Sequence, residues 1–167
     1  MDSQLEIIFS RRSIRRYTGK PVSDADVTRL LEAAMAAPSA SNKKPWHFVV
    51  VQDRSGLEAL ANAHPYGKML SGAALAIAVC GDPSISDWWV QDCAAATENI
   101  LIAAAGLGLG AVWLGCHGRD EREQAVRDTL GIPNTVGVLS LLSIGCPGEE
   151  KEARTQYDPA RVHQGQW

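Results

Sequence analysis

Apolar residues recur every three or four positions in several stretches of the chain, which predicts amphipathic helices. One such set consists of Val27, Leu30, Leu31, Ala34 and Met35. Ser23 followed by Asp26 resembles a capping box at the start of this helix, and Pro38 ends it. A short helix over Gln4–Arg11 is predicted in the same way, with its apolar residues on one face.

Two further helices are predicted later in the chain. Ser55, followed by Glu58 three positions later, predicts the start of one of these helices. This helix should end before His64, because the residue that precedes a proline is disfavoured in the helical conformation. The segment Arg119–Leu130 is rich in charged residues, so we expect an exposed helix there.

Shorter apolar runs predict four strands. Their ranges are Trp46–Gln52, Ala73–Cys80, Ala111–Gly115 and Val136–Gly145. The run Ala73–Cys80 is apolar almost throughout, a pattern typical of a central strand that is buried on both faces.

The longest predicted helix spans Asp87–Ala105, and from Cys93 onward it is apolar on almost every face. A helix of this kind is buried on most sides. Its surface is built largely from small residues: Ala94, Ala95, Ala96, Ala103, Ala104 and Ala105. We infer that a second subunit covers part of this helix. The polar tail after Pro147 ends in Trp167 and has no apolar residues at helical spacing. We therefore expect it to pack on another surface, such as the partner chain.

The length of 167 residues suits one domain with a substantial core, and no repeat or linker divides residues 1–167. Four cysteines are scattered without a Cys-x-x-Cys pair: Cys80, Cys93, Cys116 and Cys146. Buried thiols in a reducing cytosol explain this pattern better than disulfides or metal ligands. The N-terminus has acidic residues where a signal peptide has basic ones, so we place the protein in the cytoplasm.

The stretch Asn99–Gly118 contains no charged residue, but it is a poor candidate for a membrane span. A span needs about 20 apolar residues in one continuous helix, and Gly106, Gly108 and Gly110 interrupt this one. We expect a buried helix that ends at Gly106, followed by a strand near Ala111. The same glycines do not form a dinucleotide-binding loop, because such a loop follows a strand and opens a helix.

Charge is unevenly distributed along the chain. Residues 1–50 hold eight basic and five acidic side chains, whereas the remainder holds eight basic and fourteen acidic ones. Nucleic-acid binding requires an extended positive face, which an acidic chain with a small basic excess does not provide. A small anion such as a phosphate fits better, because it carries roughly −1.5 to −2 charge and arginine binds it with two parallel hydrogen bonds.

Two motifs in the first part of the chain suggest where such an anion binds. RRSIRRY (residues 11–17) packs four arginines around one serine, and PSASNKKPWHFVVV (residues 38–51) runs from a Ser/Asn loop into a strand. Taken alone, the arginines resemble a solvated cluster at the end of a helix, and Ser39 and Asn42 resemble ordinary loop residues. Together they suggest two halves of a site for a phosphorylated, planar cofactor.

The order of four segments resembles the FMN-dependent nitroreductase family. These segments are RRSIRRYTGKPV, PSASNKKPWHFVVV, DCAAATENILIAAAGLGLGAVWLG and LLSIGCPGEE, and the resemblance runs from about Ile8 to Arg154. It implies an α+β fold with a central, mostly antiparallel sheet flanked by helices. It also implies a homodimer with two FMN molecules at the interface and a C-terminal arm that packs on the partner.

The resemblance also implies which residues bind FMN. Arg11 and Ser13 would contact the ribityl phosphate, with Arg12 beside them. Arg15 would approach the N1 and O2 edge of the ring. The other subunit would contribute Pro38, Ser39, Ala40 and Asn42. Further matches are Lys68, the segment Trp113, Leu114 and Gly115 along the ring, where backbone N–H groups reach N5, and Arg154 at the phosphate.

The reaction that the resemblance implies is reduction of nitroaromatics, quinones or similar small electrophiles by NADH or NADPH, in a ping-pong sequence. FMN carries this chemistry, so we name no catalytic side chain and no metal ligand. Two alternatives remain open. One is a flavin-binding or carrier protein without turnover. The other keeps the fold but changes the reaction, as in relatives that dehalogenate or break down flavin.

Three departures from the family pattern bear on these expectations. Ala40 and Lys44 stand where the family often has Ser and Gln, so Lys44 either adds a cation near the cofactor or faces solvent. Glu152 stands where a C-terminal Lys is common, which leaves phosphate contact from the tail to Arg154, helped by Lys151. The chain is also short for the family, so we expect an open pocket and broad acceptor selectivity.

Overall fold

The computed structural model describes residues 5–167 and shows a four-stranded sheet in the order β1-β2-β4-β3. The strands are β1 (Trp46–Val51), β2 (Leu75–Gly81), β3 (Gly110–Gly115) and β4 (Gly137–Gly145). Every neighbouring pair is antiparallel. This confirms the α+β class and the antiparallel sheet that were expected from the sequence.

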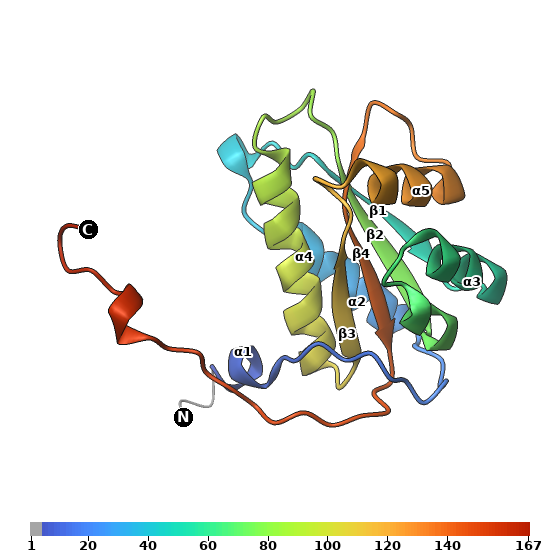
Figure 1. Ribbon diagram of the computed structural model, residues 1–167, viewed down its shortest axis with the longest axis horizontal. Coiled ribbons are helices and arrows are strands. Elements are labelled where there is room, and N and C mark those ends of the chain that lie inside the picture. Colours follow the sequence, from blue (N-terminus) through green and yellow to red (C-terminus); the bar gives the residue numbers. More distant parts are fainter. Residues whose placement is uncertain (1–4) are drawn as a thin grey trace.

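Side chains alternate across β2 and thereby create two cores. Leu75, Ile77 and Val79 face one cluster together with residues of α2 (Asp24–Met35) and α4 (Trp89–Gly106). Ala76, Ala78 and Cys80 face the other cluster, with residues of α3 (Arg54–Ala63) and α5 (Asp120–Leu130). Each helix pair therefore covers one face of the sheet (Figure 1). Because both faces are covered, β2 is buried at every position, as its apolar run predicted.

The helix boundaries differ from the predictions in small but informative ways. α2 begins as predicted, with the Ser23 side chain accepting the backbone N–H of Asp26 at 3.1 Å. The start predicted at Ser55 is wrong, because Asp53 is the N-cap of α3 and accepts the Gly56 N–H at 2.7 Å. α4 starts at Trp89 rather than Asp87 and ends at Gly106.

The short N-terminal helix α1 spans Glu6–Ser10, and Gln4, where its start was predicted, lies outside the described residues. A 3₁₀ turn, η2 (Lys68–Gly72), precedes β2 and was not predicted. The strand predicted from Ala73 begins two residues later, at Leu75. Among residues 5–167, none of the helices combines the length and the apolarity that crossing a bilayer requires.

After β4 the chain forms an arm that leaves the domain (Figure 1). Residues 152–167 are exposed throughout, and their regular structure is the short turn η3 (Pro159–Arg161). Three large side chains on this arm face solvent in the single chain: Tyr157 is 77 % exposed, Val162 47 % and Trp167 101 %. The arm therefore has no core of its own.

All four cysteines are free thiols, and the expectation that they are buried holds for three of them. Cys80, Cys93 and Cys116 are buried, and burial raises the pKa of each thiol to about 12. Cys146 is half-buried. Within residues 5–167, no group of three or more His, Cys, Asp or Glu side chains is placed to hold a metal ion.

Candidate functional site

The arginine segment, residues 11–17, runs along the free edge of β3. Ser13 forms a parallel bridge with Ala111, and the Ile14 N–H donates to the Ala111 carbonyl at 3.0 Å. Gly110 permits this approach, because a Cβ there would lie 2.5 Å from Cγ2 of Ile14. The segment thus extends the sheet, and the residues between its bonded positions are presented at the surface.

Tyr17 ties the arginine segment to β4. Its hydroxyl lies 2.9 Å from the carbonyl oxygens of Ile14 and Ser143 and 3.0 Å from Ser143 Oγ. Burial raises the pKa of Tyr17 to about 12, so the hydroxyl keeps its proton at neutral pH. The neutral hydroxyl serves as a structural donor for this part of the molecule.

Glu149 binds the same segment from the other side. Its Oε1 accepts the backbone N–H groups of Arg15 at 2.6 Å and Arg16 at 3.3 Å. The hydrogen bond from the Arg15 N–H, with that from Lys151, holds the pKa of the Glu149 carboxyl below its usual value. The Glu149 carboxylate accepts these backbone N–H groups and does not cover the Arg15 guanidinium. The Arg15 side chain therefore remains exposed to a ligand.

A pocket of about 270 Å³ lies where the arginine segment meets the end of β3. Arg15, Trp113, Leu114 and Gly115 all line it, so the structure brings these four predicted residues together. Nothing lies within 4 Å of the place where a Cβ on Gly115 would be, which leaves the backbone there open to a flat ligand.

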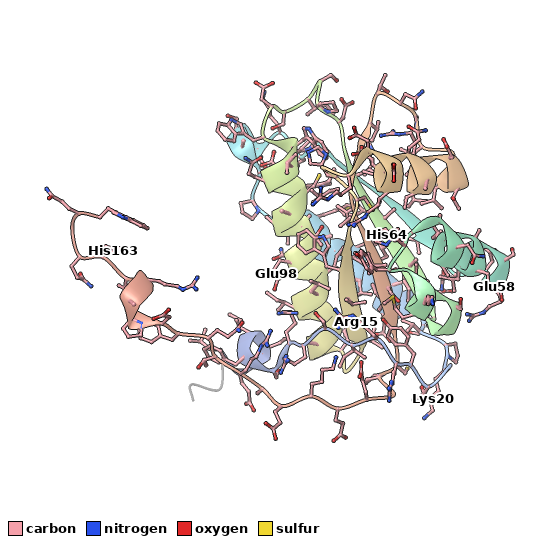
Figure 2. All side chains as sticks on the ribbon, in the orientation of Figure 1. Arg15, Lys20, Glu58, His64, Glu98 and His163 are labelled. Atoms are coloured by element: carbon pink, nitrogen blue, oxygen red, sulfur yellow. The ribbon has the colours of Figure 1, made fainter. Side chains whose placement is uncertain are left out.

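His64 lines the same pocket and was not predicted to be part of the site. It is 2 % exposed, and its Nε2 lies 3.1 Å from the Gly115 carbonyl oxygen. Its Nδ1 accepts the Tyr66 N–H at 3.2 Å, which assigns the proton to Nε2 and makes His64 the donor to Gly115. Arg15 and His64 are labelled in Figure 2.

Burial lowers the pKa of His64, and the positive charge of Arg122 lowers it further against the opposing hydrogen bond to Gly115. His64 is therefore neutral at physiological pH and holds the end of β3 in one position. A histidine before proline gave no local signal of this role, since Gly115 lies 51 residues further along the chain.

A second pocket of about 370 Å³ lies on the other side of the arginine segment, and Arg12 lines it with Lys151, Glu149 and Glu150. Lys151 Nζ donates to the Ser13 carbonyl at 2.5 Å, and Arg12 donates to the backbone carbonyl of Glu152. These bonds bring the cations that were expected near a phosphate to one place.

The other cationic residues predicted to bind FMN lie outside this pocket. Arg11 forms an ion pair with Glu98 of α4, with Nε 3.2 Å from Oε1. Arg154 donates its backbone N–H to the Phe9 carbonyl at 3.2 Å, while its side chain is exposed. Lys68 is exposed at the start of η2, beside Met69, which lines the pocket of Gly115.

The Ser/Asn loop, residues 38–44, has a strained backbone at three positions. Ser41, Asn42 and Lys44 have φ values of 51°, 56° and 52°, a left-handed conformation that is uncommon outside glycine. The 3₁₀ turn η1 (Ala40–Asn42) contains two of them. Lys44 is exposed in the single chain, and its N–H donates to Ser39 Oγ at 3.0 Å.

Asp92 holds this loop, and sequence reasoning missed it. One carboxylate oxygen accepts the Ala40 N–H at 2.8 Å, and the other accepts the Ser86 hydroxyl at 2.9 Å. Asp92 is only 5 % exposed. The available signal was a carboxylate one residue before the apolar part of the helix that begins at Cys93, because a buried charge requires hydrogen-bonding partners.

The two predicted halves do not meet within one chain. The Ser/Asn loop lies beside the N-terminal end of α4, and α1, which leads into the arginine segment, lies beside its C-terminal end (Figure 1). The 18 residues of α4 correspond to a helix about 27 Å long. This length separates the loop from the start of the arginine segment, and none of Pro38, Ser39, Ala40 and Asn42 lines the pocket that Arg15 lines.

Comparison with known proteins confirms the resemblance. Residues 8–64 and 63–146 match the model of the nitroreductase family. A protein of Archaeoglobus fulgidus, provisionally named as an NADH dehydrogenase/NAD(P)H nitroreductase, is 49 % identical over the full length of both chains.

Solved structures agree with this assignment. An FMN-dependent nitroreductase from Clostridium difficile is 31 % identical, with a TM-score of 0.93 over 98 % of this chain and 99 % of that one. A Desulfovibrio desulfuricans protein solved in complex with FMN is also 31 % identical, with a TM-score of 0.85 over 100 % of this chain and 99 % of that one.

Proposed function

Because the chain belongs to the nitroreductase family, we propose that residues 1–167 form one FMN-binding domain of an NAD(P)H-dependent oxidoreductase. Its acceptors are nitroaromatics, quinones or similar small electrophiles. The observation that carries this proposal is the pocket in which the exposed Arg15 faces the open backbone of Gly115. Similarity to a protein solved in complex with FMN supports the choice of cofactor.

The pocket beside β3 fits the ring of FMN. Gly115 has no side chain, and the space above it is free, so a flat group can lie against the strand. Trp113 and Leu114 line the same pocket and would provide apolar contact. FMN, when bound, would accept a hydride from NADH or NADPH and pass two electrons to the acceptor.

Arg15 supplies the positive charge that this chemistry requires. Electron transfer places negative charge near N1 and O2 of a flavin, and a fixed cation stabilises that charge. Glu149 fixes the Arg15 backbone without neutralising its side chain by an ion pair. His64 fixes the Gly115 carbonyl on the opposite side of the pocket. These residues orient the cofactor, and none of them needs to form a covalent bond.

The cations around Arg12 would hold the phosphate. Arg12 and Lys151 line one pocket, and Lys151 donates to the Ser13 carbonyl. The exposed side chain of Arg154 would turn toward them from the start of the arm. Arg11, which is paired with Glu98 in the structure, would also bind the phosphate. Its guanidinium would either leave Glu98 for the phosphate or bind both groups at once. A doubly charged phosphate offers more acceptor oxygens than one carboxylate, which favours this exchange.

A second copy of the chain would complete the site. The Ser/Asn loop lies away from the pocket in one chain, so the loop of a partner is the one that would reach the ring. Large apolar side chains are exposed on the surfaces that a dimer would cover: Leu5, Ile8, Met35, Trp88, Tyr157, Val162 and Trp167. The arm would pack on the partner and bury its exposed aromatic residues.

Turnover would alternate between donor and acceptor in one pocket. The nicotinamide leaves as NAD(P)⁺ after giving a hydride, which supplies two electrons and one proton. A nitro group takes those two electrons with two protons, one of them from solvent, to give a nitroso group and water. A quinone takes the same two electrons and two protons to give a hydroquinone.

The test is anaerobic reduction of protein that has been reconstituted with FMN. We expect the flavin absorbance near 450 nm to bleach with NADH or NADPH and to return when a quinone is added. Arg15→Gln should make the two-electron potential of the bound flavin more negative. Lys20→Gln, at an exposed cation three residues after the arginine segment, should leave it unchanged. Protein that takes up no FMN, or that binds FMN without reduction by either nicotinamide, would contradict the proposal.

A further inference from the structure

The mouth of the pocket beside Gly115 has an aromatic and cationic rim that the proposed function leaves unused. Tyr66 and Arg122 form it, and both line the pocket. The guanidinium carbon of Arg122 lies 5.0 Å from the centre of the Tyr66 ring, a cation–π arrangement. Tyr66 is nevertheless 63 % exposed, so the stacked pair leaves apolar surface open to a ligand.

Both members of the rim are held in place by the fold. The Tyr66 backbone N–H donates to His64 Nδ1, which is itself fixed through Gly115. Arg122 lies in the first turn of α5, and its N–H donates to the Arg119 carbonyl at 2.9 Å. Tyr66 is thus linked through His64 to the end of β3, where the flavin ring is proposed to bind, and Arg122 is placed beside it by the first turn of α5.

The charge of Arg122 is available to a ligand. Acidic residues surround it in sequence, yet within residues 5–167 its guanidinium forms no ion pair with any of them. Glu121 and Glu123 both adjoin it in sequence, and Glu123 is bound instead by Arg127 at 2.9 Å and lies 3.4 Å from His117. The side chains that line the pocket include Arg15 and Arg122 but no Asp or Glu.

We propose that this rim is an anion subsite for the electron acceptor, so that the preferred acceptors are small aromatic electrophiles carrying a carboxylate or a similar negative group. The inference rests on the proposed function and specifies the substrate class of the same site. The acceptor ring would stack on the flavin at the mouth of the pocket, its edge would contact Tyr66, and its anionic group would pair with Arg122.

The position of the rim favours an acceptor over the donor as the source of this anion. A flavin ring in the pocket of about 270 Å³ would leave the reacting ring of either substrate at the mouth, beside Tyr66 and Arg122. The phosphates of NADH or NADPH are separated from the nicotinamide by a ribose. A cation within the same small pocket as Gly115 is therefore better placed for a group attached directly to the reacting ring.

Two acceptors that differ only in charge provide the test. 4-Nitrobenzoate is an anion and 4-nitrobenzamide is neutral, and the two have nearly the same shape. The FMN-loaded enzyme is reduced anaerobically with NADH and mixed with each acceptor, and flavin reoxidation is followed at 450 nm. For the unmodified protein, we expect the second-order rate constant to be higher for 4-nitrobenzoate.

Arg122→Gln should reduce the rate constant for 4-nitrobenzoate roughly ten- to a hundredfold, as expected for one charged hydrogen-bonding partner. It should change the rate with 4-nitrobenzamide and the rate of reduction by NADH less than threefold. Arg119→Gln is the matched control, because Arg119 is an exposed arginine of the same segment that does not line this pocket. We expect it to behave as the unmodified protein.

Four outcomes would overturn the inference. Equal losses with both acceptors would mean that Arg122 shapes the pocket without recognising charge. A loss confined to reduction by NADH would assign the cation to the donor. An unmodified protein that reduces 4-nitrobenzamide but shows no preference for the anion would defeat this inference alone. A protein that reduces neither acceptor would defeat the proposed function together with it.

Discussion

The arginine segment and the Ser/Asn loop are both expected to touch the same cofactor, but the fold holds them by different means. The arginine segment is bonded along its length, to β3 through Ile14, to β4 through Tyr17 and to Glu149 through the Arg15 N–H. The Ser/Asn loop is joined to the rest of the domain mainly by one buried carboxylate, that of Asp92. One half of the site is part of the sheet, and the other is a strained loop kept in shape by a side chain.

The difference suggests separate tasks for the two regions. Left-handed residues cost of order 1 kcal/mol or more each, and they persist where surrounding structure determines them. Ser41, Asn42 and Lys44 lie in such a loop, so its conformation depends on Asp92. The arginine segment carries no such strain in the described backbone. We therefore expect substitutions at the two anchors to have different effects on stability and on FMN binding.

The largest effect is expected from Asp92→Ala. The substitution leaves the Ala40 N–H and the Ser86 hydroxyl without their charged partner in a buried position. Hydrogen bonds to charged groups contribute about 1.5–3 kcal/mol each, so the free energy of unfolding should fall by about 4 kcal/mol. FMN affinity should fall as well, because the loop loses its anchor. Urea denaturation and FMN fluorescence titration measure the two quantities.

Asp87→Ala is the control for that experiment, since Asp87 is exposed just before the same helix. We expect no change in either quantity. If Asp92→Ala lowered stability but left FMN affinity intact, the loop would not depend on this carboxylate for cofactor binding.

Alkaline pH should weaken the arginine segment's connection to β4. The pKa of Tyr17 is raised from 10.0 to about 12 in the folded protein, so its stabilisation is complete below pH 10 and is lost as the pH rises toward 12. Two pKa units correspond to at most about 2.7 kcal/mol. The buried thiols, whose pKa values rise from 9.0 to about 12, add a loss that begins near pH 9. Denaturation midpoints measured from pH 8 to 12 should show this fall, and a flat profile would contradict it.

Tyr17→Phe should have a smaller effect at neutral pH. It removes the donor shared by the carbonyls of Ile14 and Ser143, which should lower the free energy of unfolding by about 1–2 kcal/mol. It should also flatten the alkaline profile between pH 10 and 12, while FMN affinity is retained. Tyr157→Phe, at an exposed tyrosine, should leave the stability unchanged. A profile that stays as steep in Tyr17→Phe would assign the alkaline loss to the thiols.

The smallest effect is expected from Glu149→Gln and should be visible in acid. The pKa of Glu149 lies below its usual 4.5, chiefly because of the Arg15 N–H. Its stabilisation is present above pH 4.5 and is lost as the pH falls through the lowered value. Compared with Glu150→Gln, an exposed neighbour, Glu149→Gln should show a shallower decline of stability between pH 5 and 2. Identical acid profiles would show that this carboxylate does not stabilise the arginine segment.

Much of the secondary structure could be predicted because its signals are local. The Ser23 side chain caps α2 three residues away, and the end of α4 at Gly106 coincides with the glycines that interrupt the apolar run. The start of α3 was mistaken because Asp53 and Ser55 are both capable caps. In the folded chain Ser55 donates to Asp53 at 2.7 Å instead of capping the helix.

By itself, the sequence determined the strands, most helices, the family and the motifs RRSIRRY and PSASNKK. It could not determine which of their residues meet, because the decisive bonds join distant parts of the chain. The hydrogen bond between His64 and Gly115 joins residues 51 positions apart, and that between Asp92 and Ala40 joins residues 52 positions apart. Only the packing of helices on both faces of the sheet brings these groups within hydrogen-bonding distance. That packing also placed Arg15 beside Gly115 and left the Ser/Asn loop outside the pocket that these two residues line.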